Sequence, residues 1–130
     1  MTPTAAERDT IFKAFGRAFF KQDLDAMYQV VTPDFVWSVQ GGEVARMLTS
    51  REDIATYFAE RKQQVENMRF HDVVYHHAPD ASFMTFRLTG TDKLAGKAFE
   101  TIGVERYTFK HGKIATKDVY RKPCGPPPSS

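Results

Sequence analysis

The clearest structural signal in the chain is the segment Phe99-Glu-Thr-Ile-Gly-Val-Glu-Arg-Tyr-Thr-Phe-Lys-His-Gly-Lys-Ile-Ala-Thr-Lys-Asp-Val-Tyr-Arg121. Two runs rich in aromatic and β-branched residues flank His111-Gly112, a pattern that predicts a β-hairpin. If the turn has two central residues, Glu105 lies directly opposite Asp118 and two carboxylates share one face. If the loop has three residues with Gly112 in a left-handed bulge, the register moves by one and Asp118 turns to the other face. The sequence leaves both registers open.

The paired acids of the first register would be an unusual arrangement. Like charges that face each other across two strands are destabilising, so such a pair is expected only where something compensates it or one acid stays protonated. Glu105 and Asp118 are therefore the leading candidates for acid–base chemistry. The simpler interpretation is that each acid is solvated and paired with Arg106, Lys117 or Arg121 along the sheet.

The rest of the chain predicts helices first and strands afterwards. Capping-box spacing at Thr4 and Glu7 begins a one-sided helix over about 5–21, Asp23 caps a short second helix, and Ser50 caps a third. Strands are predicted over about 35–40, 44–48, 69–78, 82–91, 98–109 and 113–121. This order predicts an α+β fold with a strongly curved mixed or antiparallel sheet, wrapped around the N-terminal helices to leave a cone-shaped pocket.

Length and composition favour one globular domain over 1–122, followed by a disordered Pro-rich tail at 123–130. The 18 basic and 16 acidic residues are scattered, so neither nucleic acid nor a membrane surface is expected as a partner. The sequence has no long apolar run and no secretory signal pattern, and we expect a cytoplasmic protein. Its single cysteine, Cys124, excludes an internal disulfide.

Three segments resemble the nuclear transport factor 2-like superfamily, and within it the SnoaL-like and ketosteroid-isomerase-like branch. They are Phe19-Phe-Lys-Gln-Asp-Leu-Asp-Ala-Met-Tyr-Gln-Val-Val-Thr-Pro-Asp-Phe-Val-Trp37, Ser50-Arg-Glu-Asp-Ile, and Tyr107-Thr-Phe-Lys-His-Gly-Lys-Ile. The resemblance covers roughly residues 6–121 and implies a single SnoaL-like domain. The same fold hosts isomerases, dehydratases, polyketide cyclases, epoxide hydrolases and plain binding domains, so the resemblance implies fold before function.

The family's catalytic positions carry over only in part. Similarity to ketosteroid isomerases implies that Phe15 stands where their oxyanion-hole tyrosine lies, and that Glu105 stands at the oxyanion acid. Their proton-moving aspartate falls at or beside Val39. Similarity to the SnoaL-like cyclases gives the final-strand acid to Asp118, with Thr116 where a histidine often precedes it.

Arg87 is the third candidate for catalysis. Epoxide-hydrolase-like members of the superfamily imply an arginine on an inner strand, and Arg87 matches it although the paired aspartate is Thr89. Alternation on this strand separates an apolar face from a polar face that carries Arg87. If the polar face lines the pocket, Arg87 can pair with Glu105 and hold an oxyanion. The alternation argument equally allows it to face water or a partner subunit.

Aromatic residues and one histidine are the candidates for lining the pocket. The ligand-binding set is Phe15, Tyr28, Trp37, Tyr57, Phe58, Tyr107 and His76. His76 and His77 are adjacent on a strand and point to opposite faces, so they cannot chelate one metal ion together. One of them must point inward, although a hydrogen-bonded structural role is the commoner fate of such a residue.

These patterns lead to two functional hypotheses. The first is a cofactor-free, metal-independent enzyme doing acid–base chemistry of the isomerase, cyclase or lyase type on a small apolar carbonyl compound, with Glu105, Asp118 and Arg87 as its catalytic residues. The second is a non-catalytic ligand-binding or dimerisation module with an incomplete triad. A homodimer is expected through the convex sheet face, which Ile102, Val104 and Ile114 could form.

Overall fold

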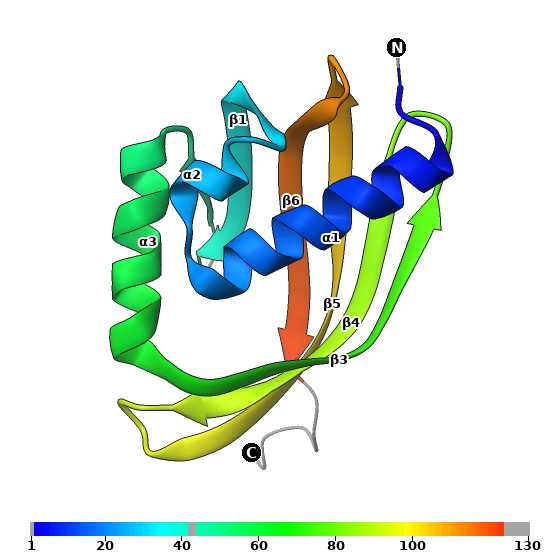
Figure 1. The fold of residues 1–130 in the computed structure, drawn as a ribbon. Coiled ribbons are helices and arrows are strands. Elements are labelled where there is room, and N and C mark those ends of the chain that lie inside the picture. The colour runs from blue at the N-terminus through cyan, green and yellow to red at the C-terminus, as the bar shows by residue number, and fades with distance from the viewer. Residues whose placement is uncertain (1, 42–43, 124–130) are drawn as a thin grey trace.

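The computed structural model describes residues 2–41 and 44–123, which form three helices and six strands (Figure 1). The helices are α1 (Ala5–Lys21), α2 (Leu24–Met27) and α3 (Arg51–Gln64). The strands are β1 (Val31–Gly41), β2 (Val44–Leu48), β3 (Val65–His77), β4 (Ser82–Asp92), β5 (Lys97–Lys110) and β6 (Lys113–Pro123). The predicted tail at 123–130 lies outside the described residues except for Pro123, which ends β6.

The six strands form one curved sheet in the order β2-β1-β6-β5-β4-β3. All neighbours are antiparallel except β1 and β6, which run parallel, so the sheet is mixed. Helix α1 crosses the concave side of this sheet, and α2 and α3 lie at its β1 side (Figure 1). The predicted α+β architecture, with the sheet curved around the N-terminal helix, is confirmed.

The predicted helix caps are present at all three N-termini. Thr4 and Glu7 form a complete capping box on α1, Asp23 caps α2, and the Ser50 side chain accepts from the backbone of Asp53 at the start of α3. These short polar side chains satisfy backbone N–H groups that have no partner inside the helix. Local sequence chemistry is therefore sufficient to place the helix starts.

The core lies between α1 and the concave face of the sheet. Alternate residues of β4 point inward, so Met84, Phe86 and Leu88 are buried while the residues between them are partly exposed. Phe12 and Phe15 of α1 pack against them from the other side within one hydrophobic cluster. The polar face of β4, which carries Arg87, is consequently the outer, convex face.

The β5–β6 hairpin combines the predicted turn with an irregularity farther along. His111 and Gly112 both have positive φ, 53° and 73°, and Lys110 pairs with Lys113, as a two-residue turn requires. The register then shifts at Ala115, because Ile114 pairs with Phe109 while Thr116 pairs with Thr108. This β-bulge adds one residue to β6 and reverses the direction of every side chain that follows it.

The predicted pairing of two acids is therefore wrong. Asp118 pairs with Arg106 on the convex side, and Glu105 lies opposite Val119. Lys117, rather than Thr116, is the partner of Tyr107. The turn has the two central residues of the first register, but the bulge displaces β6 by one residue, so Asp118 lies on the face that the second register gave it.

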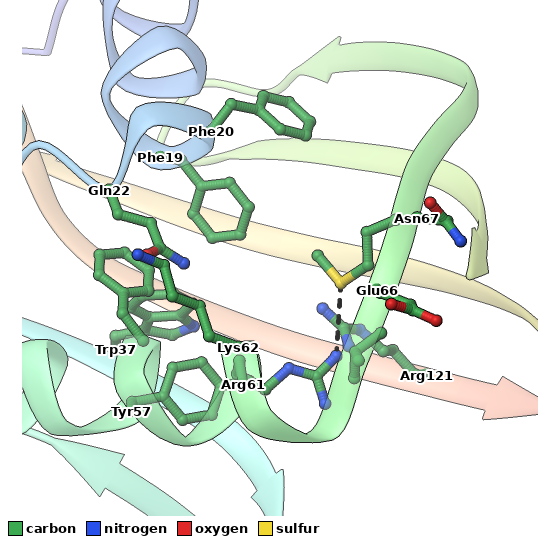
Figure 2. Close-up of a pocket in the computed structure, with 13 residues that line it drawn as sticks. Phe19, Phe20, Gln22, Trp37, Tyr57, Arg61, Lys62, Glu66, Asn67 and Arg121 are labelled. Carbon is green, nitrogen blue, oxygen red and sulfur yellow. Dashed lines mark hydrogen bonds between the residues drawn. The ribbon is translucent and has the colours of Figure 1, made fainter. Parts of the chain in front are cut away.

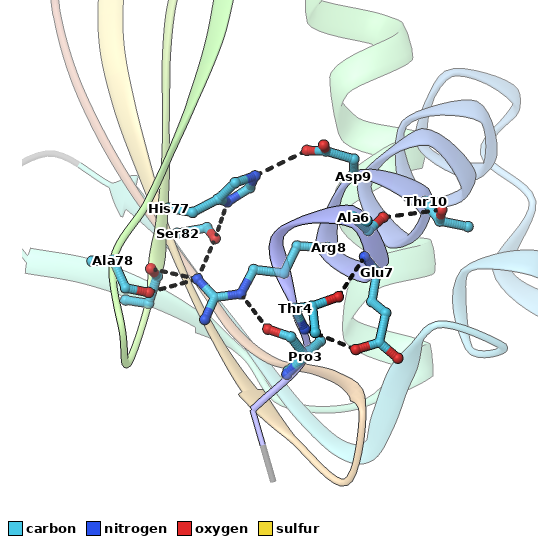
Figure 3. Close-up of polar contacts among 11 residues, drawn as sticks. Pro3, Thr4, Ala6, Glu7, Arg8, Asp9, Thr10, His77, Ala78 and Ser82 are labelled. Atoms are coloured by element: carbon cyan, nitrogen blue, oxygen red, sulfur yellow. Dashed lines mark hydrogen bonds and ion pairs between the residues drawn. The ribbon is translucent and has the colours of Figure 1, made fainter.

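A buried arginine attaches the start of α1 to the β3–β4 turn (Figure 3). Arg8 is 5% exposed and donates five hydrogen bonds, all to uncharged acceptors. The acceptors are the carbonyl oxygens of Pro3, Ala78, Pro79 and Ala81 and the hydroxyl of Ser82. Beside it, the His77 ring contacts both Ser82 and Asp9. This cluster fixes one end of α1 against the sheet edge.

Replacing Arg8 with methionine should lower the free energy of unfolding by about 2–4 kcal/mol, because several buried carbonyl groups lose their donor. Urea denaturation followed by circular dichroism measures the change. Arg17→Met on the exposed side of the same helix is the control, and its effect should stay within about 0.5 kcal/mol. Equal effects of the two substitutions would show that the Arg8 cluster does not stabilise the fold.

Candidate functional site

Three polar side chains are buried together on the concave face beneath α1. Glu105, Tyr107 and Lys117 are 1%, 2% and 3% exposed. The Tyr107 hydroxyl donates a hydrogen bond to Oε1 of Glu105, and Nζ of Lys117 lies 3.4 Å from the same oxygen. Strands β5 and β6 hold this arrangement, since Tyr107 and Lys117 are directly paired. The second carboxylate oxygen, Oε2 of Glu105, is buried and has no hydrogen-bond partner among the described residues.

The Lys117 amine is surrounded by aromatic rings. Its Nζ lies 4.4 Å from the ring centre of Trp37, 4.5 Å from that of Phe19 and 5.1 Å from that of Phe15. Trp37 is also the residue paired with Lys117 across the parallel β1–β6 ladder. The faces of aromatic rings attract a cation, so these rings partly replace the water that the ammonium group loses on burial.

Burial changes the proton affinities of these groups. Burial lowers the pKa of Lys117, and the neighbouring Glu105 carboxylate opposes this change. Burial also raises the pKa of Tyr107 well above its usual range, with the negative charge of Glu105 adding to the effect. The pKa of Tyr75, on the same cavity wall, rises to about 12 for the same two reasons. Both tyrosines therefore keep their protons at neutral pH and can act as hydrogen-bond donors.

A small apolar cavity of about 120 Å³ gives access to the three polar groups. Apart from Glu105, Tyr107 and Lys117, its lining is almost entirely apolar and comes from α1, β3 and β4: Phe15, Gly16, Phe19, Phe20, Phe70, Val73, Tyr75 and Met84. Phe20 and Val73 are exposed. The cavity therefore reaches the molecular surface between α1 and β3.

A second cavity of about 210 Å³ adjoins the first and shares Phe19 and Phe20 with it (Figure 2). The ends of α1, α3 and β6 and the beginning of β3 form it. Trp37, Tyr57 and Phe58 line this cavity together with Arg61 and Arg121.

Three residues predicted for the site lie elsewhere. Asp118 is on the convex side, where Oδ2 accepts a hydrogen bond of 2.7 Å from the Tyr120 hydroxyl. Arg87 is also on that side, paired with Glu100 at 2.8 Å and Asp72 at 3.4 Å. His76 is exposed and contacts Thr85. Arg87 and His76 point outward because of strand alternation, and Asp118 does so because of the bulge at Ala115.

The other predicted residues divide between the two cavities. Glu105, Phe15 and Tyr107 line the first cavity, whereas Trp37, Tyr57 and Phe58 line the second. Tyr28 lines neither cavity, because its ring packs against the guanidinium group of Arg51 at 5.3 Å. Its predicted role in binding a ligand has no geometric basis.

The sequence-based prediction missed Lys117 and Arg121. Lysine and arginine on a strand normally indicate a solvated face, and strict alternation from the turn placed Lys117 with the outward set. The second register that the sequence left open, shifted by one residue, places Lys117, Val119 and Arg121 on the inner face, and the bulge at Ala115 produces that shift. Bulges leave little trace in a sequence, since Ala-Thr fits an ordinary strand equally well.

Within residues 2–41 and 44–123, no group of three or more His, Cys, Asp or Glu side chains could hold a metal ion. No helix in the same ranges is long and apolar enough to span a membrane.

Comparison with solved structures identifies the fold. A nuclear transport factor 2-like protein from Burkholderia xenovorans matches with a TM-score of 0.81 at 19% identity, covering 92% of each chain. A proposed polyketide cyclase from Xanthomonas campestris matches with a TM-score of 0.72 at 15% identity, covering 88% of this chain and 90% of that one. TerC, co-crystallised with polyporic acid, matches with a TM-score of 0.76 at 15% identity, covering 89% of this chain and 92% of that one.

Sequence comparison supplies the family. A search of curated protein sequences gave no match. The model of the SnoaL-like domain matches residues 12–117, which include both α1 and most of the β5–β6 hairpin. Because this match spans most of the chain and the nuclear transport factor 2-like fold is shared with the solved structures, the protein belongs to the SnoaL-like domain family.

Proposed function

We propose that the chain is an enzyme that transfers a proton at a carbon atom next to the carbonyl group of a small apolar compound. The observation that carries this proposal is Oε2 of Glu105, a buried carboxylate oxygen without a partner on the wall of an apolar cavity. A buried acceptor that no protein group satisfies is costly, and it is common where a ligand supplies the missing donor.

The groups beside Glu105 suit this reaction. Glu105 takes the proton, the electron pair of the broken C–H bond moves toward the carbonyl carbon, and negative charge gathers on the carbonyl oxygen. Lys117 carries a positive charge and Tyr107 a hydroxyl donor within the same low-dielectric site, where such groups stabilise an enolate strongly. Return of the proton to another atom gives an isomerisation, and attack of the enolate carbon on a second carbonyl gives a cyclisation.

The catalytic set differs from the one expected from the sequence. Asp118 and Arg87 lie on the convex face and take no part, whereas Lys117 and Tyr107 join Glu105. The family match and the co-crystallisation of TerC with polyporic acid support a role in binding a small molecule.

Replacing Glu105 with glutamine should abolish proton exchange next to a carbonyl group. Small cyclic ketones are incubated with the protein in heavy water, and deuterium uptake at the carbon beside the carbonyl is followed by NMR. The wild-type protein should accelerate uptake, and Glu105→Gln should slow it by about 100-fold or more, since the amide cannot take the proton.

Asp118→Asn is the matched control, because it removes an acid from the same hairpin on the opposite face. It should leave the exchange rate unchanged. Equal rates for wild type and Glu105→Gln would refute the proposed role of Glu105.

The ionisation of Lys117 can be tested through stability. Because the lysine pKa is lower in the folded protein than its ordinary 10.5, the unfolded chain binds more protons between those two values. Stability from this group therefore rises as the pH increases through the interval below 10.5, in which the folded chain has already lost this proton and the unfolded chain still holds it. Lys117→Met lacks this contribution, so the difference in free energy of unfolding between wild type and variant should grow across that range.

Denaturant titrations of both proteins at several pH values measure the difference in free energy of unfolding. Tyrosines also titrate at alkaline pH, but both proteins contain the same tyrosines, so the comparison between them isolates Lys117. At neutral pH the variant should be less stable by about 3 kcal/mol, because Glu105 is left buried without its counter-charge. The double variant Lys117→Met/Glu105→Gln should recover part of this loss. A difference that stays constant or shrinks with pH would mean that the amine is not desolvated.

A second candidate function is that of a dimerising binding module, favoured by the apolar convex face. Ile102, Val104 and Tyr120 are 40%, 36% and 58% exposed, and Val104 and Tyr120 are directly paired across β5 and β6. Ile114, expected in this face, is instead fully buried in the core. A second copy of the chain covering the convex face would remove this apolar patch from water.

Sedimentation equilibrium at micromolar concentration should show a homodimer that Val104→Glu converts to a monomer, since a charge would be desolvated at the interface. Val44→Glu, at an exposed apolar position on β2, should remain dimeric. A monomeric wild-type protein would refute this mode of association.

A further inference from the structure

The second cavity holds an excess of positive charge that the described part of the chain does not neutralise. Arg61, Lys62 and Arg121 line it, against the single acid Glu66. Arg61 and Arg121 come from α3 and β6, and both line this cavity (Figure 2). Across residues 2–41 and 44–123, no carboxylate lies within 4.0 Å of either arginine, and Glu66 pairs with neither.

The donors in this cavity are unsatisfied as well as charged. Nε of Arg121 and Nε1 of Trp37 are buried and have no hydrogen-bond partner in the described residues. The contact seen for Arg61 is a weak one of 3.6 Å to the sulfur of Met68. Burial lowers the pKa of Arg121, while Tyr57 and Glu105 oppose this change and the positive charge of Arg61 adds to it. Desolvating N–H groups without an acceptor costs free energy that a bound acceptor would restore.

Comparison with Lys117 shows that the core does not provide these arginine donors with partners. Lys117 and Arg121 lie on the inner face of the same strand, four residues apart. The lysine has the Glu105 carboxylate at 3.4 Å, whereas among the described residues no carboxylate lies within 4.0 Å of Arg121. An anion from outside the chain is the missing counterpart.

The shape and lining of the cavity indicate which chemical class of anion would bind there. A guanidinium group presents parallel N–H donors that match the two oxygens of a carboxylate. The rings of Phe19, Trp37, Tyr57 and Phe58 form the remainder of the wall, which suits a flat apolar body. We propose that this cavity binds a small aromatic carboxylic acid, with its carboxylate on Arg121 and Arg61 and its ring against these aromatic side chains.

This binding site is independent of the proton transfer proposed for Glu105. The two cavities share the wall made by Phe19 and Phe20, so a compound held through its carboxylate lies with its apolar end near the first cavity. Binding can therefore be measured whether or not the first cavity is catalytic.

Trp37 provides a direct reporter, because it is the only tryptophan of the chain, it lines the cavity, and its buried indole N–H has no hydrogen-bond partner among the described residues. ¹⁵N-labelled protein is titrated with benzoate, with benzamide as its uncharged counterpart, and with inorganic phosphate as a non-aromatic anion. Benzoate should shift the indole signal in a saturable way and bind at least about tenfold more tightly than benzamide. A tenfold difference is expected because one charge-assisted hydrogen bond contributes about that much to affinity. Phosphate should give no saturable shift.

Variants assign the effect to the arginines. Arg121→Gln and, separately, Arg61→Gln should each weaken benzoate binding by about tenfold or more and leave benzamide unchanged. Arg87→Gln, on the convex face, should bind benzoate as the wild type does. Spectra with native dispersion establish that each variant is folded. If Arg121→Gln does not fold, Arg61→Gln provides the test, because Arg61 lies on the partly exposed side of α3.

Each remaining outcome overturns the proposal. Equal affinity for benzoate and benzamide would mean an apolar pocket without charge recognition. Saturable binding of phosphate as tight as that of benzoate would mean a general anion site. An indole signal that no probe moves would mean that the cavity does not bind this class of compound.

Discussion

The ion pair between the Lys117 ammonium group and the Glu105 carboxylate is the interaction on which the interior of this protein depends. Each charge alone would cost several kcal/mol to bury, and the pair is tolerated because the opposite charge, the Tyr107 hydroxyl and several aromatic faces replace the lost water. The pair requires Glu105 and Lys117 on one face, which the bulge at Ala115 provides. The polar centre of the concave side is thus a consequence of one extra residue in β6.

The curved sheet separates two kinds of charge. On its convex face, Arg87 with Glu100 and Asp72 forms partly exposed pairs that water screens, and these contribute little to stability. On its concave face, the same residue types lie in a low-dielectric interior, where their proton affinities shift and their interactions strengthen. Strand alternation, together with the bulge at Ala115, decides which acids and bases fall into each group.

Helix α1 makes the concave side an enclosed site. Its N-terminal end is held to the β3–β4 turn by Arg8, and its aromatic residues cover the Glu105–Lys117 pair. Farther along, Phe19 and Phe20 separate a cavity whose charges are internally paired from one whose arginines are not. Two adjacent cavities with different charge balance can serve different parts of one ligand, the reacting carbonyl and the group that anchors it.

Residues adjacent in sequence were enough to predict the elements of this fold. Helix caps at Thr4, Asp23 and Ser50 and the position of the His111-Gly112 turn depend on local backbone chemistry and were predicted correctly. The strands were also predicted, but β1 begins at Val31 and β3 at Val65 rather than at about 35 and 69. Glu105 was also predicted to face the pocket, because alternation over the regular part of β5 is reliable. The partners of Glu105 could not be predicted in this way. Whether Lys117 or Asp118 points inward depends on the bulge at Ala115, which lies where β6 pairs with both β1 and β5 and where both ladders shift register, so the pairing of strands distant in sequence selects between the two faces.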